Sequence, residues 1–596
     1  MATYLRLLVL LLFSTPRAAD SDAGDHLATK QDLATCLSSA GVNNYTIRPA
    51  ELCSDATFSY NRLLKFSIQN LRFARSSVAK PAAVILPRSK MDLRSSVLCL
   101  RASNLAIRVR SGGHSYEGLS YSAENGTPFA VVDLMNLNRV RVDPVCRTAW
   151  VEAGATLGEF YYAVAKFSNG TLAFSAGSCP TVGSGGHIAG GGFGLLSRKF
   201  GLAADNVLDA VLIDSAGRVL DRAAMGEDVF WAIRGGGGGN WGAVYTWKVR
   251  LSPIPDRVSA FIVNLPGPTR LMSELVDEWQ RVAPSLPDEF FLSAFVGARL
   301  PESTRVGMSV TFKGLYLGAK IKAVEILAEL FPGIGLSDPD VEEMSWIQSV
   351  VHFSGLPKGS TVSDLKSRAL QDKTFFKAKS DYVRARISKP ALISALDLLS
   401  QEPRAYLILD PYGGAMDRVG SDHLPFPHRG GNLYAIQYLI EWTAEDDGES
   451  ERYMGWIRRF YEYMEGHVSK GPRAAYVNYL DLDLGSRERT AAIDWSRKPV
   501  EEARAWGEKY FLGNYERLVR AKTAVDPDNL FNHEQSIPPD KGTALGVIRK
   551  DPNSPIVSVL QRILGIREGE NGNVNHATCP SKGCIEYRAV DDDVLI

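Results

Sequence analysis

Between residues 79 and 254, apolar positions come in short runs separated by turn residues. Four such runs are AAVILP (82–87), AIRVRSG (106–112), FAVVDL (129–134) and TAWVEAG (148–154). Short runs rich in β-branched residues predict strands. The segment TLGEFYYAVAKF (156–167) instead repeats its apolar residues at helical spacing. Strands mixed with helices and glycine-rich connections predict an α+β domain.

The pattern changes after LSPIPDRV (251–258), where two prolines interrupt regular structure. From there to residue 475, amphipathic helices such as TRLMSELVDEWQRVA (269–283) alternate with strands such as RVGMSVTFKGLYLG (305–318). This alternation predicts a second unit, an antiparallel sheet covered on one face by helices.

The strand LYAIQYLIEW (433–442) has two predicted faces, because successive side chains point to opposite sides. One face is apolar and suits a core; it carries Tyr434, Ile436, Tyr438, Ile440 and Trp442. The other is mixed, with Ala435, Gln437, Leu439 and Glu441. We expect Gln437 to face the substrate as a ligand or a support for a base, and Glu441 to be a solvated charge at a sheet edge.

The two ends of the chain differ from its middle. Residues 1–19 have Arg6 before an apolar core and small residues near a cleavage point, which predicts a secretory signal peptide. The apolar run is too short for a membrane anchor. Residues 29–78 show helical patterning around LATCLSSAGV (33–42), followed by a polar, extended stretch. The segment 541–596 is rich in Gly, Asn and Asp and predicts a loosely packed or disordered tail.

The composition mainly argues against nucleic-acid and membrane partners. The 596 residues carry 67 basic and 67 acidic side chains, so no net field would attract nucleic acid or an anionic membrane. Asn44, Asn125 and Asn169 lie in glycosylation sequons, which suit an exported chain but also arise by chance. No HExxH, Walker loop or paired CxxC is present, and the spacing of His576, Cys579 and Cys584 suits zinc poorly, so no metal is expected.

Two glycine-rich segments each contain one nucleophilic side chain. His114 lies in RVRSGGHSYEGLSY (108–121) and Cys179 in AGSCPTVGSGGHIAGGGFG (176–194). Histidine and cysteine are the residues best able to add to an electrophilic ring near neutral pH. Glycines let backbone N–H groups approach a phosphate or a flat cofactor closely. The pair predicts a flavin cradle with two covalent attachments, although a loop histidine and a buried or disulfide-bonded cysteine are the plainer alternatives.

Further motifs follow in a fixed order: KSDY (379–382), FPHRGGNLYAIQY (426–438), YVNYLDLDLG (476–485) and EQSIPP (534–539). With these motifs the chain, from about Cys36 to Pro539, resembles the berberine bridge enzyme-like family of plant FAD-linked oxidases. The resemblance implies a two-part FAD-binding domain of PCMH type with an inserted substrate domain. Its parts would be an N-terminal part at 20–78, the PCMH-type part at 79–254, the insertion at 255–475 and a rejoining segment at 476–540.

The resemblance also implies how FAD is held. His114 would bond to the 8α carbon of the flavin and Cys179 to C6, while Cys36 and Cys99 would form a disulfide. Cys53, Cys146, Cys579 and Cys584 cannot be paired from the sequence. We expect phosphate and ring contacts from the glycine runs, although 235–242 could instead be a flexible linker. The predicted cofactor-binding residues are Arg110, Ser111, Gly112, Gly113, Ser115, Gly183, Gly185, Gly186, His187, Gly190, Gly191 and Gly192. His187 would sit at the polar edge of the flavin or be a structural histidine bonded to backbone.

Tyr479 matches the catalytic tyrosine of the family. An alcohol gives up hydride more readily as its proton leaves, so a base is needed beside the flavin. Tyrosine needs a tuned environment for this role, and Tyr116 could supply the partner. Both tyrosines could instead be packing residues. Val182 matches an oxygen-gating position at which valine is associated with oxidases, although it could simply pack.

The chain departs from the family at three positions. Relatives resembling monolignol oxidases have a lysine and a tyrosine where this chain has Ala435 and Phe193. His533 precedes EQSIPP, where asparagine is frequent. Loss of the lysine and the tyrosine removes a cation and a hydroxyl from the expected base network.

The sequence therefore predicts a secreted, glycosylated, monomeric FAD-linked oxidase that passes electrons to O2 and releases H2O2. The favoured substrate is the anomeric hydroxyl of a cell-wall oligosaccharide. The alternatives are an allylic alcohol of monolignol type, or a flavin-bearing extracellular binding or storage glycoprotein with little turnover. The expected location is the extracellular space or cell wall, with the vacuole as an alternative.

Overall fold

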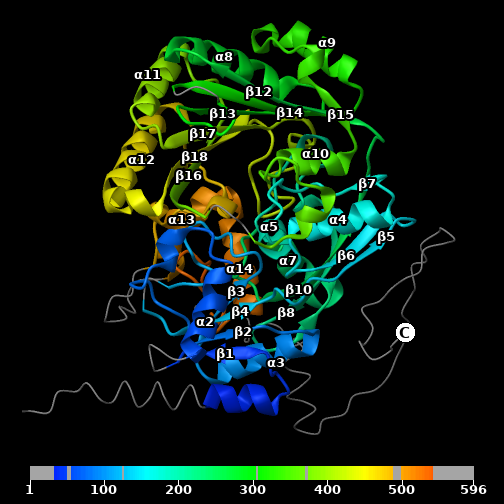
Figure 1. Cartoon of the computed structure of the whole chain (residues 1–596). Coiled ribbons are helices and arrows are strands. Elements are labelled where there is room, and N and C mark those ends of the chain that lie inside the picture. Colours follow the sequence, from blue (N-terminus) through cyan, green and yellow to red (C-terminus); the bar gives the residue numbers. More distant parts are fainter. Residues whose placement is uncertain are drawn as a thin grey trace, which may run out of the picture.

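The computed structural model describes residues 32–49, 55–123, 126–303, 307–369, 373–487 and 499–540 (Figure 1). Its first unit is a four-stranded sheet in the order β1-β2-β4-β3. These strands are β1 (Tyr45–Ile47), β2 (Ala83–Ile85), β4 (Phe129–Asp133) and β3 (Ala106–Arg110). Strand β4 pairs in parallel with both β2 and β3. Helix α3 (Lys90–Ala102), capped by the Ser89 hydroxyl, connects β2 to β3. A parallel pair needs such a crossover connection.

The N-terminal segment contains two helices rather than one. Residues 32–39 are helical, and Cys36 is disulfide-bonded to Cys99 of α3, as expected. The polar stretch that follows was predicted to be extended, and this prediction is wrong for residues 55–66, which form helix α2 (Asp55–Phe66). Only a narrow stripe of α2 is buried, at Tyr60 and Leu64, so its apolar periodicity is weak.

A second, five-stranded antiparallel sheet has the order β5-β6-β10-β8-β9. Its strands are β5 (Val140–Asp143), β6 (Thr148–Glu152), β10 (Ala243–Arg250), β8 (Val207–Ile213) and β9 (Val219–Leu220). Helix α4 (Leu157–Phe167) starts at a capping box of Thr156 and Glu159, which satisfies backbone N–H groups at its first turn. Two short helices, α5 (Ser184–Ala189) and α6 (Ser197–Phe200), follow α4, and α7 (Arg222–Ala232) comes after β9. The short strands β7 (Leu172–Ala173) and β11 (Ser252–Pro253) pair at the exit from this region.

The third sheet is a seven-stranded antiparallel layer in the order β15-β12-β14-β13-β17-β18-β16. It consists of β12 (Val258–Pro266), β13 (Phe290–Gly297), β14 (Ser309–Tyr316), β15 (Glu342–Met344), β16 (Phe375–Val383), β17 (Ala405–Pro411) and β18 (Tyr434–Trp442). Helices α8 (Thr269–Val282), α11 (Lys389–Ser400) and α12 (Ser450–Met464) lie along its outer face, with α9 (Lys320–Leu330) beside them and α10 (Trp346–Phe353) nearer the second sheet (Figure 1).

The expected apolar face of β18 packs beneath these helices. The ring of Tyr434 contacts Trp279 of α8, with centroids 5.1 Å apart, and Tyr438 contacts Phe460 of α12 at 5.9 Å. The antiparallel sheet covered on one face by helices is therefore confirmed, and so is the α+β class. The opposite face of β18 looks toward the first two sheets.

The chain leaves the third sheet and returns to the first two through residues 476–487 and the helices α13 (Pro499–Phe511) and α14 (Tyr515–Val525) (Figure 1). The Ile107 N–H of β3 donates to the Leu530 carbonyl, and Lys522 Nζ donates to the Asn240 carbonyl at 2.6 Å. Within the described ranges, no helix has the length and apolar character needed to cross a bilayer. The return places residues 476–487 between the third sheet and the glycine-rich segments.

Candidate active site

A cavity of about 380 Å³ lies where four separate parts of the chain meet. It is lined by β3 and the following residues 111–116, by residues 179–189, by the glycine run 237–242, and by residues 477–480 and 533–535 of the returning segment. Most of the predicted cofactor-binding residues line it, namely Ser111, Gly112, Gly113, His114, Ser115, Cys179, Gly183, Gly185, Gly186 and His187. Concave sites of this size are typical of cofactor binding.

Close backbone contacts explain the glycines. A Cβ on Gly112 would lie 2.3 Å from the Gly183 nitrogen, so the two glycine-rich segments touch only because both lack side chains. A Cβ on Gly186 would meet no atom within 4 Å, so this glycine leaves open space on the cavity wall. Among the described residues, the backbone N–H groups of residues 112–115 donate no hydrogen bond. Free N–H groups beside open space suit a flat, phosphate-bearing cofactor. The residues present therefore fit FAD.

His114 and Cys179 meet at one hydroxyl group. Nε2 of His114 lies 2.9 Å from Oγ1 of Thr181, and Sγ of Cys179 lies 3.6 Å from the same oxygen. Burial and, to a smaller extent, the charge of Lys373 lower the pKa of His114 to about 4. The imidazole is therefore neutral near pH 7, the state in which its nitrogen can attack carbon. Cys179 is a free, half-buried thiol. Both predicted attachment residues reach one cavity.

Four of the expected cofactor contacts lie elsewhere. Arg110 is fully buried outside the cavity, where its Nε donates to Asp133 at 2.7 Å and its other nitrogens donate to the Leu63 and Leu64 carbonyls. Gly190, Gly191 and Gly192 do not line the cavity either. A Cβ on Gly190 would lie 2.0 Å from Asn478, and the Gly192 N–H donates to Tyr476 Oη at 3.0 Å. Gly190 thus leaves room for Asn478 of the returning segment, and Gly192 is hydrogen-bonded to the same segment.

His187 is bonded to the backbone, as one of its two expected roles requires, and it also lines the cavity. Its Nε2 accepts the Gly177 N–H at 3.0 Å, so the proton of the neutral ring is on Nδ1. Burial lowers the pKa of His187 to about 4, and the side chain also lines the cavity. His533 lines the same cavity and accepts the Gln535 N–H at 3.2 Å.

Two tyrosines form the wall between the cavity and the third sheet. The rings of Tyr116 and Tyr479 are stacked, with centroids 5.3 Å apart and an angle of 1°. Gln437 Nε2 donates to Tyr116 Oη at 2.7 Å, and Phe376 of β16 packs edge-on against the Tyr116 ring. The three predicted catalytic side chains thus lie together.

The surroundings of Tyr479 do not ease its ionisation. Burial raises the pKa of Tyr479 well above its usual value, and the neighbouring Tyr116 and Asp410 act in the same direction. Phe193, which replaces a tyrosine of the monolignol-type relatives, supplies no hydroxyl group; its ring stacks on Tyr412, with centroids 5.2 Å apart. Tyr116 therefore fixes the position of the Tyr479 ring without acting as the activating cation that a phenol base needs.

The prediction for Glu441 is wrong. Glu441 is half-buried and accepts a hydrogen bond from Tyr406 Oη at 2.7 Å, and burial raises the pKa of its carboxyl group. Strand β18 is not at the sheet edge, because β16 pairs along its full length on one side and β17 on the other.

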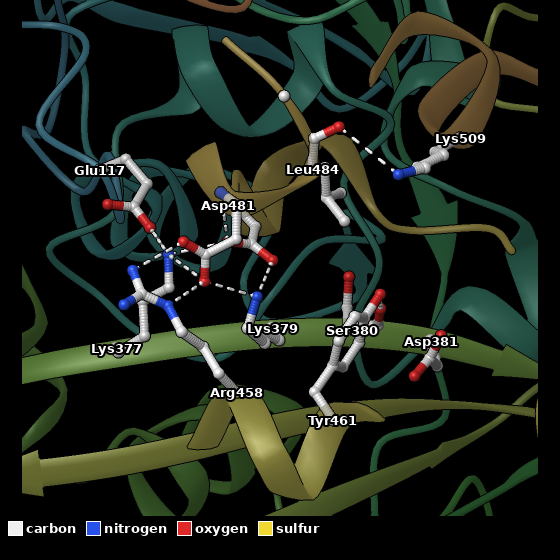
Figure 2. Close-up of polar contacts among 12 residues, drawn as sticks. Glu117, Lys377, Lys379, Ser380, Asp381, Arg458, Tyr461, Asp481, Leu484 and Lys509 are labelled. Atoms are coloured by element: carbon white, nitrogen blue, oxygen red, sulfur yellow. Dashed lines mark hydrogen bonds and ion pairs between the residues drawn. The ribbon is translucent and has the colours of Figure 1, made fainter. Parts of the chain in front are cut away.

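A buried ionic network joins the segments that carry the two tyrosines (Figure 2). Lys377 and Lys379 extend from the same side of β16 toward Asp481, which lies two residues after Tyr479. Lys377 also pairs with Glu117, the neighbour of Tyr116, and each lysine Nζ is 2.7 Å from one Asp481 oxygen. Asp483 completes the network with Lys379 and Arg458, at 2.7 and 2.8 Å. Lys377, Lys379, Glu117 and Asp481 are all nearly inaccessible, so the network fixes the backbone on both sides of the tyrosine stack.

Sequence reasoning missed Asp410, which is half-buried on the inner face of the third sheet. The available signal was one acidic residue in the otherwise apolar strand AYLILDP (405–411). Its alternation with Tyr406 and Ile408 places it on the face opposite the helices.

The comparisons with known proteins agree with this geometry. The family model for an FAD binding domain matches residues 81–222, and the model described as berberine and berberine like matches residues 475–538. Berberine bridge enzyme-like D-2 of Nicotiana tabacum is 52% identical over 518 residues, covering 85% of this chain and 91% of that protein. The chain belongs to the berberine bridge enzyme-like family.

Solved structures of the family extend the match. The berberine bridge enzyme from Eschscholzia californica is 48% identical with a TM-score of 0.80, over 85% of this chain and 99% of that one. Phl p 4, a grass pollen allergen with glucose dehydrogenase activity, is 39% identical with a TM-score of 0.77, over the same shares. As a berberine bridge enzyme-like protein, this chain is an FAD-dependent oxidoreductase.

Two predicted glycosylation sites lie in the described part of the chain. Asn169 is exposed, in a turn with a φ of 51°. Asn44 is half-buried, and its Nδ2 donates to the Leu86 carbonyl at 3.1 Å. Asn125, Cys53, Cys579, Cys584, the signal segment and the tail 541–596 lie outside the described residues. Within the part that the structure describes, His, Cys, Asp and Glu side chains form no group of three or more able to hold a metal ion.

Proposed function

We propose that this protein is a secreted oxidase that carries FAD attached at both His114 and Cys179 and oxidises the anomeric hydroxyl of a cell-wall oligosaccharide. The observation that carries the proposal is the meeting of both nucleophiles at Thr181 on the wall of one cavity. When bound, FAD supplies the electrophilic centre that accepts a hydride from the substrate carbon. The protein supplies position, desolvation and a route for the proton.

Thr181 orients the two attachment residues. Its hydroxyl can donate to one partner and accept from the other, which fixes the imidazole and the thiol relative to each other. The low pKa of His114 keeps the ring uncharged and nucleophilic throughout the physiological range.

Aromatic rings beside the cavity support a sugar substrate. Tyr116 and Tyr479 line the cavity and form one stack, and Phe193 and Tyr412 form another. Ring faces of this kind stack on the apolar faces of pyranoses. The glucose dehydrogenase activity of Phl p 4 also favours a sugar, whereas Ala435 and Phe193 weigh against a monolignol.

The proposal also includes an electron acceptor and a cellular location. Val182 lines the cavity between Cys179 and the glycine run, which supports O2 as the electron acceptor and H2O2 as the product. The Cys36–Cys99 disulfide and the exposed sequon at Asn169 support export to the extracellular space or cell wall.

The test is an anaerobic screen. The yellow holoprotein is mixed with a panel of mono- and oligosaccharides and, in parallel, with allylic aromatic alcohols, and bleaching of the flavin is followed. We expect reducing sugars to bleach it and admission of air to restore the colour with formation of H2O2. Bleaching by aromatic alcohols alone contradicts the sugar assignment, and no bleaching by any donor contradicts the oxidase.

A further inference from the structure

A connected group of half-buried side chains lies on and beside the inner face of the third sheet. We call this group the distal cluster; its members are Phe295 of β13, Glu302, Lys313 of β14, Tyr406 of β17 and Glu441 of β18. The inner face is the one opposite the covering helices, and it looks toward the first two sheets (Figure 1). None of these five residues lines the cofactor cavity.

Direct contacts join the members of the distal cluster. Tyr406 Oη donates to Glu441 Oε1 at 2.7 Å, and Lys313 Nζ lies 2.7 Å from Glu302 Oε1. The same ammonium group lies 4.2 Å from the centroid of the Phe295 ring, where cation and ring attract each other. Burial raises the pKa of Tyr406 well above its usual value, and Glu441 and Glu302 act in the same direction, so this phenol lies near both carboxylates.

The register of the strands places the distal cluster next to the side chains predicted to be catalytic. Glu441 follows Gln437 by four residues on the same face of β18, a separation of about 13 Å along the strand. Phe295 and Gln437 both lie opposite Ile408, on either side of β17, and are therefore about 10 Å apart. Gln437 donates to Tyr116, which lines the cavity. A sugar whose reacting carbon lies beside Tyr116 needs more than one ring to reach the cluster.

The distal cluster has hydrogen-bonding capacity that the described part of the chain does not use. Glu302 Oε2 is buried without a partner among the described residues, and Glu441 accepts a described side-chain donor at Oε1 alone. Burial lowers the pKa of His352 of α10, and the charge of Lys313 acts in the same direction, so these two side chains are close. The His352 Nε2 also has no partner within the described ranges. Hydroxyl groups of a ligand can bond to all three of these groups.

The chemistry of the distal cluster favours a neutral sugar. Carboxylate oxygens accept from sugar hydroxyl groups, and an ammonium group donates to them. An aromatic ring such as that of Phe295 packs on the apolar face of a pyranose. The two carboxyl groups of the cluster face one ammonium group, Lys313, which is already paired with Glu302. A uronic acid would bring its own negative charge beside Glu441, and like charges repel.

We propose that the distal cluster is a binding subsite for the rings of a neutral oligosaccharide that follow the oxidised one. This inference rests on the proposed function and narrows its substrate from cell-wall oligosaccharides in general to uncharged ones. Tyr406, Glu441 and Lys313 supply hydrogen bonds, and Phe295 supplies a stacking surface. The subsite holds the sugar chain in place and takes no part in the transfer of hydride.

Anaerobic stopped-flow with the holoprotein tests the subsite. Glucose, cellobiose and cellotriose are compared with galacturonic acid, its dimer and its trimer, and the second-order rate constant of flavin reduction is measured for each sugar. In the wild type, cellotriose should exceed glucose by about tenfold or more, the effect of one hydrogen bond to a charged group. The galacturonide series should show no such gain.

Three substitutions in the distal cluster should remove the gain: Glu441→Gln, Lys313→Met and Phe295→Ala. Each should lower the ratio of the cellotriose to the glucose rate constant to about threefold or less. Glu329→Gln, at an exposed position of α9, is the matched control and should keep the wild-type ratio. Glu441→Gln can still accept from Tyr406 but has no negative charge, so it should also raise the rate constant of the galacturonic acid trimer by about threefold.

A binding measurement separates the subsite from the reaction. Methyl β-cellotrioside cannot be oxidised at its methylated anomeric oxygen, and its binding to the holoprotein is measured by calorimetry. Glu441→Gln and Phe295→Ala should weaken this binding by about tenfold, and Glu329→Gln should not change it.

The outcomes distinguish the subsite from the oxidase. Bleaching by sugars without a preference for cellotriose over glucose, a larger gain in the galacturonide series, or equal ratios in the wild type and Glu441→Gln overturns the subsite and leaves the oxidase standing. Absence of methyl β-cellotrioside binding overturns the subsite as well. If no sugar bleaches the flavin but the glycoside binds and Glu441→Gln weakens it, the oxidase fails and the subsite is supported.

Discussion

Tyr116 and Tyr479 come from distant parts of the chain, and their rings are stacked with an interplanar angle of 1°. The contact joins the residue that follows the His114 loop to the segment that returns from the third sheet. Gln437 fixes the Tyr116 hydroxyl from the sheet side. The stack therefore fixes the distance between the cofactor cavity and the inner face that carries Asp410.

Tyr479→Phe keeps this stack and removes one hydroxyl. Because burial raises the pKa of Tyr479 well above its usual value, we expect the hydroxyl to contribute a neutral hydrogen bond to the substrate, worth about 1 kcal/mol. Flavin reduction should then slow by about fivefold in anaerobic stopped-flow, with unchanged flavin content. A loss of about a hundredfold or more, the scale of a missing general base, would show that the phenol itself accepts the proton.

The two attachments to FAD should be independent. In His114→Ala and in Cys179→Ala, the remaining bond should still hold the flavin through acid denaturation, because each side chain reaches the cavity from a different segment. The double variant should release free FAD. Denaturation followed by filtration and absorbance of the filtrate measures this directly, and release of FAD from the wild type contradicts attachment at both residues.

Val182→Leu should slow reoxidation by O2 and spare reduction by substrate. Val182 lines the cavity three residues after Cys179, so an added methylene group would narrow the space inside the cofactor cavity. Stopped-flow mixing of the reduced protein with oxygenated buffer is the measurement. Val145→Leu, at a residue that is 78% exposed, serves as the control. Equal oxygen kinetics in Val182→Leu and wild type would remove the gating role.

Lys377→Met should destabilise the protein strongly. Burial alone would lower the pKa of Lys377, but Glu117, Asp481 and Asp483 raise it, which shows that their charges hold the ammonium form. Removing the lysine leaves buried carboxylates unpaired, a loss of about 3–5 kcal/mol. Chemical denaturation measures it, with the exposed Lys389→Met as control. Adding Glu117→Gln to Lys377→Met should restore part of the loss; no recovery would argue against the charge-pair explanation.

Asp410→Asn should be more stable than the wild type above neutral pH. The folded-state pKa of Asp410 is about 7, above the unfolded value of about 3.9, so the protonated form favours folding. That contribution is complete below about pH 4 and is lost as the pH rises through about 7, amounting to at most about 4 kcal/mol. The difference between variant and wild type should therefore grow from pH 4 to 8 in denaturation experiments. A difference independent of pH contradicts the raised pKa.

Local patterns in the sequence predicted the features that depend on neighbouring residues. The alternation in β18 identified its core face from Tyr434 to Trp442, because a strand presents the same period wherever it lies. The glycines around His114 and Cys179 predicted a cradle, and the structure brings both residues to one cavity. The disulfide between Cys36 and Cys99 came from the family resemblance and is present.

Features that depend on distant partners could not be predicted in the same way. Glu441 was expected at a sheet edge because residues 433–442 alone do not show that β16 pairs with β18. Arg110 was expected at the cofactor, but its partner Asp133 comes from the neighbouring parallel strand. Asp410 became visible only when the register of β17 and β18 placed it beside Gln437.

The ionic network has a consequence for the order in which the protein is made. Glu117, Lys377 and Lys379 leave the ribosome before Asp481, and until Asp481 arrives Lys377 has Glu117 as its one buried partner in this network and Lys379 has none. Two ammonium groups with one counter-charge do not tolerate removal from water. The wall between the cofactor cavity and the third sheet therefore closes only when synthesis is nearly complete. A nascent chain that stalls earlier has neither the Tyr479 ring nor the closed site, so it is released without the capacity to oxidise anything.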